Sequence, residues 1–236
     1  MGVLTDLVSW FADPINWQGT TGIPTRLLEH VWYSVLALVL AVAIAQPVGI
    51  LIGHTGRGGA LAINLSNAVR AVPTFGVILL TFLVAGIGLA PVLVALVVLA
   101  IPSMVTNTYV GIRSVDRDVR DSAEGMGMTG WQVVRRVEIP VAMPLIMAGI
   151  RISAVQIVAT ATFAAVVSLG GLGRYIIDGL AQRDLTQVLA GAILVAALSL
   201  LTELALSRLQ AAVVSNGLQG EKDKTIREAQ LGDAQN

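Results

Sequence analysis

The stretch best suited to a specific task is residues 121–140, a charged, helix-prone segment in an otherwise apolar chain. It carries ionisable side chains such as Asp121, Glu124, Arg135 and Arg136, which are costly inside a bilayer. Its regular pattern also distinguishes it from an unstructured loop. A short amphipathic element at one side of a membrane is suited to mechanical work, in which a soluble partner pushes on a membrane protein.

Catalytic chemistry has little support elsewhere in the sequence. The chain has no cysteine, which excludes disulfides, thiolate metal sites and cysteine nucleophiles. His30 and His54 stand at the two ends of one apolar run, and we expect both at the surface or the membrane interface. The spans lack Gly-x-Ser-x-Gly, paired aspartates and zinc-ligand spacing, which argues against an intramembrane enzyme. We predict no catalytic residue, no metal site and no cofactor bound by this chain.

The composition predicts an integral membrane protein. Of 236 residues, 55% are hydrophobic and 13% charged, whereas a soluble domain carries about 25% charged residues. Lys plus Arg and Asp plus Glu both number 15, so the net charge indicates neither an acidic nor a basic partner. No basic face is concentrated enough for nucleic acid, and we expect membrane lipid as the surrounding medium.

Stretches without charge predict five membrane-spanning helices. A helix needs about 20 apolar residues to cross the hydrocarbon core. No Lys, Arg, Asp or Glu lies between His30 and Gly56 or between Arg70 and Arg113, and glycine and proline at 86–91 predict a turn in the second run. The expected spans are 31–52, 67–87, 91–111, 141–169 and 186–206.

The distribution of arginine predicts the orientation. Five arginines crowd the connection between spans three and four, whereas the connection after span four has two, so the first connection is cytoplasmic. The amino terminus is then outside and the carboxyl terminus inside. We divide the chain into an extracytoplasmic segment (1–30), a transmembrane domain (31–210) and a cytoplasmic, disordered tail (211–236). Apolar spacing near Leu4 and Val8 fits either an interfacial helix or a frayed end.

The polar stretch predicts two short helices at an angle. The first covers 115–126, and Gly125 and Gly127 allow a sharp change of direction. Thr129 and Gln132 have the spacing of a capping box, which begins the second helix. Pro140 is expected to end it. An L-shaped pair of helices follows, with apolar side chains that need a pocket in the spans or in a partner.

Within this stretch, Asp-Ser-Ala at 121–123 is followed after three residues by Gly127, after nine more by Val137, and after one more by Ile139-Pro140. This spacing resembles the cytoplasmic signature of the permease subunits of bacterial ABC importers, Glu-Ala-Ala, three residues, Gly, nine residues, Ile, one residue, Leu-Pro. The resemblance implies an all-α, polytopic fold of the MetI-like ABC permease type with a cytoplasmic coupling helix. The ATPase-coupling residues that it implies are Asp121, Ser122, Ala123, Glu124, Gly125, Met126, Gly127, Met128, Thr129 and Pro140.

Further segments narrow the resemblance to permeases that import osmoprotectants such as glycine betaine, choline and carnitine. They include Val72-Pro73-Thr74, Ile101-Pro102-Ser103, Gly149-Ile150-Arg151 and Leu169-Gly170-Gly171-Leu172-Gly173. Such a permease resides in the bacterial inner or plasma membrane. Its partners are a second permease copy or paralogue, two cytoplasmic ATPase subunits and an external substrate-binding protein. This chain has no phosphate-binding loop, so ATP and Mg are expected in the partner ATPase.

Polar residues and prolines within the spans suggest a translocation pathway. The candidates are Gln46, Pro73, Thr74, Pro102, Asn107, Gln156, Thr160 and Thr162. Prolines free backbone carbonyls, which can break helices around a pathway or merely kink them. Polar side chains can equally serve as hydrogen bonds between helices. The residues alone leave both interpretations open.

Two alternatives remain at this stage. A permease for methionine or another small solute would share the coupling signature. A stand-alone carrier or channel generally needs ionisable groups in its spans, and Glu203 is the only carboxylate inside an expected span.

Overall fold

The computed structural model describes residues 2–214, and all regular structure in that range is helical. The first elements are α1 (Val3–Ala12), the 3₁₀ turn η1 (Pro14–Trp17), α2 (Ile23–Thr55), α3 (Gly59–Ala71), α4 (Thr74–Ala85) and α5 (Leu89–Arg113). After them come α6 (Arg117–Gly125), α7 (Gly130–Val133), the π-helical turn η2 (Val134–Glu138), α8 (Ile139–Thr160), the 3₁₀ segment η3 (Ala161–Val167), α9 (Gly173–Gln182) and α10 (Leu185–Val213). The all-α prediction is confirmed. The predicted disordered tail lies, from residue 215 onward, outside the described residues.

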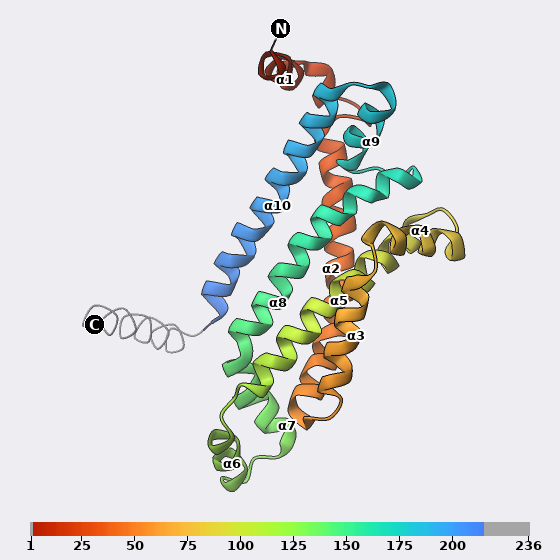
Figure 1. The fold of residues 1–236 in the computed structure, drawn as a ribbon. Coiled ribbons are helices and arrows are strands. Elements are labelled where there is room, and N and C mark those ends of the chain that lie inside the picture. The colour runs from red at the N-terminus through yellow and green to blue at the C-terminus, as the bar shows by residue number, and fades with distance from the viewer. Residues whose placement is uncertain (1, 215–236) are drawn as a thin grey trace, which may run out of the picture.

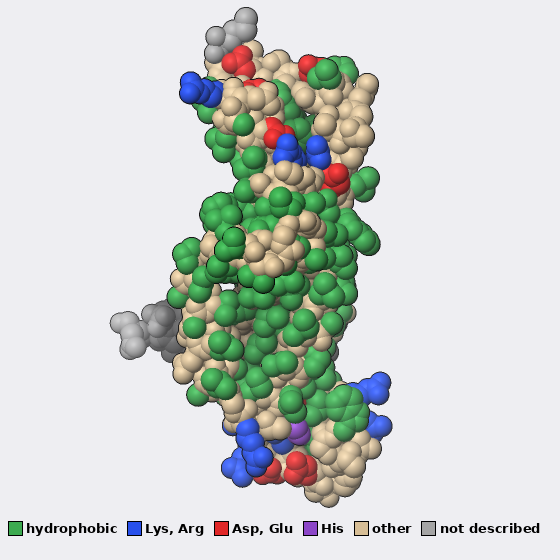
Figure 2. All heavy atoms as spheres, turned by 90° about the vertical axis from the view of Figure 1, so that its right-hand side faces the viewer, with side chains coloured by type: hydrophobic (Ala, Val, Ile, Leu, Met, Phe, Trp, Pro, Cys, Tyr) green, Lys and Arg blue, Asp and Glu red, His purple; other side chains and the backbone are tan. Residues whose placement is uncertain are grey.

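Four described segments are long and apolar enough to cross a membrane: Ile23–Thr55, Leu89–Arg113, Gly130–Val167 and Leu185–Val213. They run side by side along the length of the molecule (Figure 1). On the face shown in Figure 2, charged side chains gather at the two ends and apolar ones cover the middle. This distribution fits a slab of lipid around the middle. Four of the five expected spans are thus confirmed, and the first begins at Ile23 rather than at residue 31.

The expected second span, 67–87, is wrong as a continuous helix. In its place, α3 and α4 meet at an angle of 89°, and together they form one broken span or a re-entrant loop. The break falls at Val72-Pro73, where Val72 takes an extended conformation (φ −75°, ψ 130°). Proline disfavours the helical region for the residue before it and has no N–H to donate, so the helix ends there.

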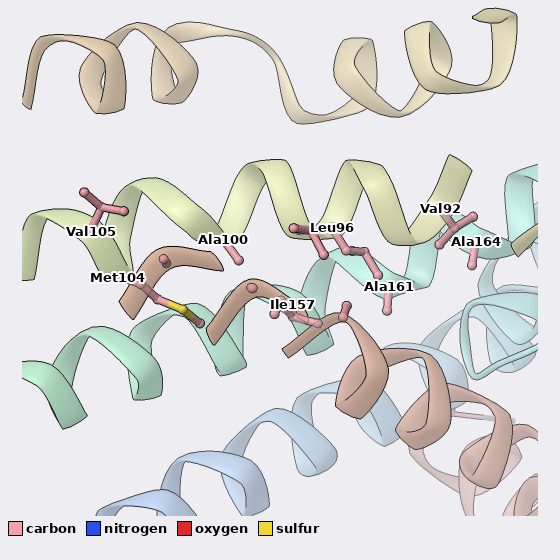
Figure 3. Close-up of a cluster of buried hydrophobic side chains, with 12 residues drawn as sticks. Val92, Leu96, Ala100, Met104, Val105, Ile157, Ala161 and Ala164 are labelled. Atoms are coloured by element: carbon pink, nitrogen blue, oxygen red, sulfur yellow. The ribbon is translucent and has the colours of Figure 1, made fainter. Parts of the chain in front are cut away.

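Small residues hold α2 against α5 and α8. Ala37, Ala41 and Ala45 recur every fourth residue on α2 and are fully buried. The same stripe continues to Gly49 and Gly53, where an added Cβ would lie 2.7 Å from Thr108 and 2.6 Å from Ile112. Larger side chains of α5 and α8 fill the space opposite, among them Leu96, Met104 and Ile157 (Figure 3). Small residues permit this close approach of helices, which supplies packing energy within a membrane.

At the end of the molecule that carries α1, the loop between η3 and α9 folds back onto α2. His30 Nε2 lies 2.9 Å from the carbonyl oxygen of Val158, and the backbone N–H of Leu172 donates to His30 Nδ1 at 3.2 Å. Because a carbonyl only accepts, His30 carries its proton on Nε2. The side chain is fully buried, so the expected surface position is wrong for this histidine.

Replacing His30 with leucine is expected to lower the melting temperature by about 4 °C or more. The change leaves the Val158 carbonyl and the Leu172 amide without their buried partner, at a cost of about 1–3 kcal/mol for each group. Thermal unfolding of the detergent-solubilised protein measures the effect. Ser9→Ala, which removes an exposed hydrogen bond to Asp6, is the control and should leave the melting temperature unchanged. Equal melting temperatures for both variants would contradict the structural role of His30.

The segment before α2 is a packed helix rather than a frayed end. Trp10 and Phe11 of α1 contact each other edge to face. Trp10 also packs edge to face against Tyr175, with 5.5 Å between the two ring centroids. Burial raises the pKa of Tyr175 to about 12, so its hydroxyl stays protonated and donates to the Thr21 carbonyl at 2.7 Å. The helical spacing of α1 is therefore confirmed. Its attachment to the membrane interface stays a prediction.

Candidate functional site

The expected coupling segment forms α6, which lies at the end of the molecule opposite α1 (Figure 1). Asp116 caps the helix by accepting the N–H of Asp118 at 2.8 Å. Of the predicted coupling residues in α6, Ala123 is 2% exposed and faces the protein's own helices. Asp121, Ser122 and Glu124 are exposed. One face of α6 thus anchors it, and the remaining face is free for a partner.

Gly127 alone makes the sharp turn after α6. It has φ +86°, a left-handed conformation, whereas Gly125 is an ordinary helical residue. The Gly127 N–H bonds to the Glu124 carbonyl at 2.8 Å, and the Met128 N–H bonds to the Ala123 carbonyl at 3.2 Å. This pair of bonds is a Schellman motif, whose C′ position favours glycine. The expectation that Gly125 shares the turn is wrong.

The second arm of the expected L is the start of a membrane span. The capping box forms, with the Thr129 N–H donating to Gln132 Oε1 at 2.8 Å, and α7 begins there. The helix then runs through Pro140 without a break, so the expected end at Pro140 is wrong. The π-helical turn η2 explains why: the Ile139 N–H reaches back five residues to the Val134 carbonyl. The wider turn places the proline at the start of α8, where no N–H is needed.

Apolar side chains project from this end of the molecule. Met126 is 73% exposed and Trp131 is 68% exposed, and Val119 of α6 is also exposed. Met126 and Val119 lie outside the spans, so lipid does not explain their exposure, and Trp131 is the second residue of the segment Gly130–Val167. We call α6 and the turn to α7 the coupling tip, residues 117–131. Exposed apolar residues between charged ones are typical of a protein contact.

A charged cavity of about 590 Å³ lies behind α6, lined by His54, Arg113, Ser114, Val115, Asp116, Arg117, Arg120, Asp121, Glu124 and Glu138. Sequence reasoning missed Glu138, whose side chain is fully buried. Its carboxylate meets His54 Nδ1 at 2.9 Å and Arg120 Nε at 3.2 Å. The one available signal was its place in the signature, at the unspecified residue between Val137 and Ile139-Pro140.

Several predicted pathway residues make hydrogen bonds within the bundle. Thr108 donates to Gln46 Oε1 at 2.8 Å, which joins α5 to α2. Gln156 of α8 donates to the Leu99 carbonyl of α5 at 3.4 Å, whereas Asn107 bonds within α5 to Ser103. These contacts favour the packing interpretation for the three amide side chains. The amide nitrogen of Gln46, Nε2, is buried and has no hydrogen-bond partner among the described residues.

The other predicted pathway residues lie around the helix breaks. Pro73 and Thr74 stand at the break between α3 and α4, and Thr160 and Thr162 at the change from α8 to η3. The two breaks touch, because the rings of Phe75 and Phe163 lie 5.5 Å apart. Pro102 is separate from them: it is buried in α5 and its carbonyl accepts the Ser66 hydroxyl at 3.5 Å.

The carboxylate expected inside a span is paired. Glu203 of α10 meets Arg151 of α8 at 2.9 Å, and Arg151 also donates to Gln210. A paired carboxylate is a helix contact, which weakens the case for a proton-coupled carrier based on Glu203. Within residues 2–214, no three side chains of the His, Asp or Glu type lie close enough together to hold a metal ion.

Comparisons with known proteins agree with this geometry. Residues 45–215 match the family model described as binding-protein-dependent transport system inner membrane component. The chain is 35% identical over 195 residues to the glycine betaine/carnitine/choline transport system permease protein OpuCB of Bacillus subtilis, covering 83% of this chain and 90% of that protein. It is 36% identical over 204 residues to the carnitine transport permease protein OpuCB of Listeria monocytogenes, covering 86% and 90%.

The fold resembles that of solved transporters. A chain of the inward-facing MetNI methionine ABC transporter superposes with a TM-score of 0.69 at 24% identity, covering 80% of this chain and 94% of that one. At this identity the likeness concerns the fold, and it confirms the expected MetI-like architecture. The matched family model covers more than half of the sequence. The chain is therefore a member of the binding-protein-dependent transport system inner membrane components, a multi-pass permease subunit of an ABC importer whose ATP is hydrolysed by a separate subunit.

Proposed function

We propose that this permease imports osmoprotectant quaternary amines such as glycine betaine, choline and carnitine. The observation that carries the proposal is the 35% identity, over most of both chains, to a Bacillus subtilis permease named for these three solutes. A choline permease of the same organism is 33% identical over 84% of this chain. A quaternary ammonium has no hydrogen to donate and is held by aromatic cages. With 5% aromatic residues in this chain, we assign the cage to the external substrate-binding protein.

The proposed complex contains a second permease, identical or paralogous, two cytoplasmic ATPase subunits and the binding protein. The partner ATPases bind ATP and Mg, and this chain binds no cofactor. The coupling tip faces the cytoplasm and docks on an ATPase through Asp121, Ser122, Glu124 and Met126, while Gly127 and Thr129 set the geometry of the turn. The segment before α2 then lies outside the cell, and the end of α10 faces the cytoplasm. The course of α10, which starts beside α1 and runs toward the end of the molecule that carries the coupling tip, supports this orientation (Figure 1).

Movement of the tip passes to the spans through an unbroken helix. The segment Gly130–Val167 joins the turn after α6 to α8 and η3 without an interruption at Pro140. When the two ATPases close on ATP, the tips move with them, and the α8 helices rotate as rigid bodies between outward-open and inward-open states. Transporters place their substrate where helices are interrupted at membrane depth. We therefore place the pathway beside the break at Pro73-Thr74 and the α8–η3 junction at Thr160 and Thr162.

An uptake panel tests the proposed substrate class. The chain is expressed with its ATPase and binding protein in a bacterial host that lacks its own osmoprotectant importers. Uptake of radiolabelled glycine betaine, choline, carnitine and methionine is then measured at high osmolarity. We expect energy-dependent accumulation of at least one quaternary amine and none of methionine. Accumulation of methionine without any quaternary amine would overturn the assignment.

A further inference from the structure

Glu138 occupies an unusual place for a carboxylate. It lies in the π-helical turn η2 between the coupling tip and the span α8, and none of its surface is exposed. A buried carboxylate is stable only when it is paired and hydrogen-bonded. Glu138 Oε2 is hydrogen-bonded to His54, whereas Oε1 pairs with Arg120 by charge, at 3.2 Å and without hydrogen-bond geometry, and neither partner belongs to the helix of Glu138.

The first partner joins Glu138 to the coupling tip. Arg120 projects from the inner side of α6, with 15% of its side chain exposed, and its Nε lies 3.2 Å from Glu138 Oε1. The guanidinium also donates from Nη2 to the carbonyl of Ile112, a fully buried residue at the end of α5. One arginine thus bridges α6 to the ends of two spans. Its planar fork of donors suits such a bridge better than a lysine would.

The second partner joins Glu138 to α2. His54, near the end of α2, donates from Nδ1 to Glu138 Oε2 at 2.9 Å. The other edge of the imidazole faces the start of α7, where a Cβ built on Gly130 would lie 3.5 Å from Nε2. The ring of His54 therefore lies between the Glu138 carboxylate and the first residue of α7.

We propose that Arg120, Glu138 and His54 form an ionic linkage that makes α6 move as one body with α8 and α2. The inference rests on the proposed function, because it names the residues that carry movement of the tip into the spans. If α6 slid alone, the buried charge of Glu138 would lose its compensating cation, and such separation is strongly unfavourable. By contrast, Arg117 and Asp121 of the same helix form an exposed pair at 3.7 Å, which contributes little to rigidity. The three residues are positioning residues, since none needs to touch the solute or ATP.

The test compares Glu138→Gln with the wild type in the complete transporter in proteoliposomes, with ATP hydrolysis and solute uptake measured together. We expect Glu138→Gln to assemble and hydrolyse ATP but to move about fivefold less solute per ATP, within the range of coupling between distant sites. Arg120→Met/Glu138→Leu replaces the charges by apolar side chains of similar size, which restores folding where the single variant is unstable. It should keep the low ratio of uptake to hydrolysis. A wild-type ratio in this double variant would overturn the linkage.

Arg174→Gln is the matched control. Arg174 also pairs with a carboxylate, Asp178, at 2.7 Å and donates to a backbone carbonyl, that of Ala165, but at the opposite end of the molecule. We expect a wild-type ratio of uptake to hydrolysis in this variant. An equal fall in Arg174→Gln and Glu138→Gln would show that the loss of any such ion pair has this effect, and would overturn the proposal.

A second readout separates the linkage from the proposed function. Melting temperatures of the wild type, Arg120→Gln, Glu138→Gln and the double variant Arg120→Gln/Glu138→Gln form a double-mutant cycle that requires no solute. If the pair acts as one unit, the double variant melts no lower than Glu138→Gln alone. Additive losses would refute the linkage, whereas failure of the wild type to transport any quaternary amine would refute only the proposed substrate class.

Discussion

Replacing Met126 with aspartate is expected to weaken binding of the partner ATPase by about 30-fold or more, corresponding to about 2 kcal/mol. Met126 is 73% exposed at the coupling tip and lies outside the spans. The stability of the folded permease therefore depends little on this side chain. Its exposed thioether chain is suited to fill an apolar pocket on the ATPase. A carboxylate in that pocket would be buried without a partner. Co-purification of the detergent-solubilised permease with the ATPase measures the loss.

Ile15→Asp provides a matched control for this prediction. Ile15 is also 73% exposed, and it lies between α1 and α2 at the other end of the molecule. The same apolar-to-acidic change there should leave ATPase binding at the wild-type level. If Met126→Asp bound the ATPase as tightly as Ile15→Asp, the coupling tip would not be the docking surface.

Replacing Gly127 with valine is expected to reduce uptake by about tenfold while the protein still inserts in the membrane. Among the described residues, no atom lies within 4 Å of a Cβ added at Gly127, so a side chain meets no obstacle there. The backbone is the constraint: at φ +86° an L-residue pays about 1–2 kcal/mol, and a β-branched one more. The strain is relieved by opening the Schellman turn, which shifts α6 away from its docking position. Uptake per inserted permease is the measurement.

Two further variants show whether backbone strain is the cause. Asparagine tolerates the left-handed region, so Gly127→Asn should retain most of the uptake. Gly19→Val introduces the same strain at φ +73° in open space near α1, and it should transport normally. Equal activity of Gly127→Val and Gly127→Asn would contradict the account of the turn.

Hydropathy identified the spans but not the interruption within one of them. The residues of α3 and α4 form a long apolar stretch, and apolarity alone does not show where the helix axis changes direction. The bend depends on the local conformation of Val72 before Pro73, and prolines elsewhere behave differently. Pro47 and Pro102 stay within α2 and α5, and Pro140 is accommodated by a π-helical turn. The same residue type thus breaks a helix, stays within one or begins one, according to the turn that precedes it.

The signature spacing located the coupling tip, because Gly127, the capping box and the apolar positions are local features. The buried partners of the tip depend on contacts between distant residues. His54 and Glu138 are 84 positions apart, and His30 meets a loop 142 positions away. A histidine or glutamate beside arginines has the sequence character of a surface residue, and only the packing of α2, α6 and η2 places Glu138 inside. Ionic contacts within a fold are therefore harder to predict than its helices.

Uptake of labelled glycine betaine by proteoliposomes tests the central claim most directly. The vesicles contain the permease with its ATPase, and the substrate-binding protein is added to the side that carries α1. Accumulation is predicted only when ATP is present on the side of the coupling tip and the binding protein on the opposite side. Accumulation by the permease alone, without ATPase or ATP, would contradict the account.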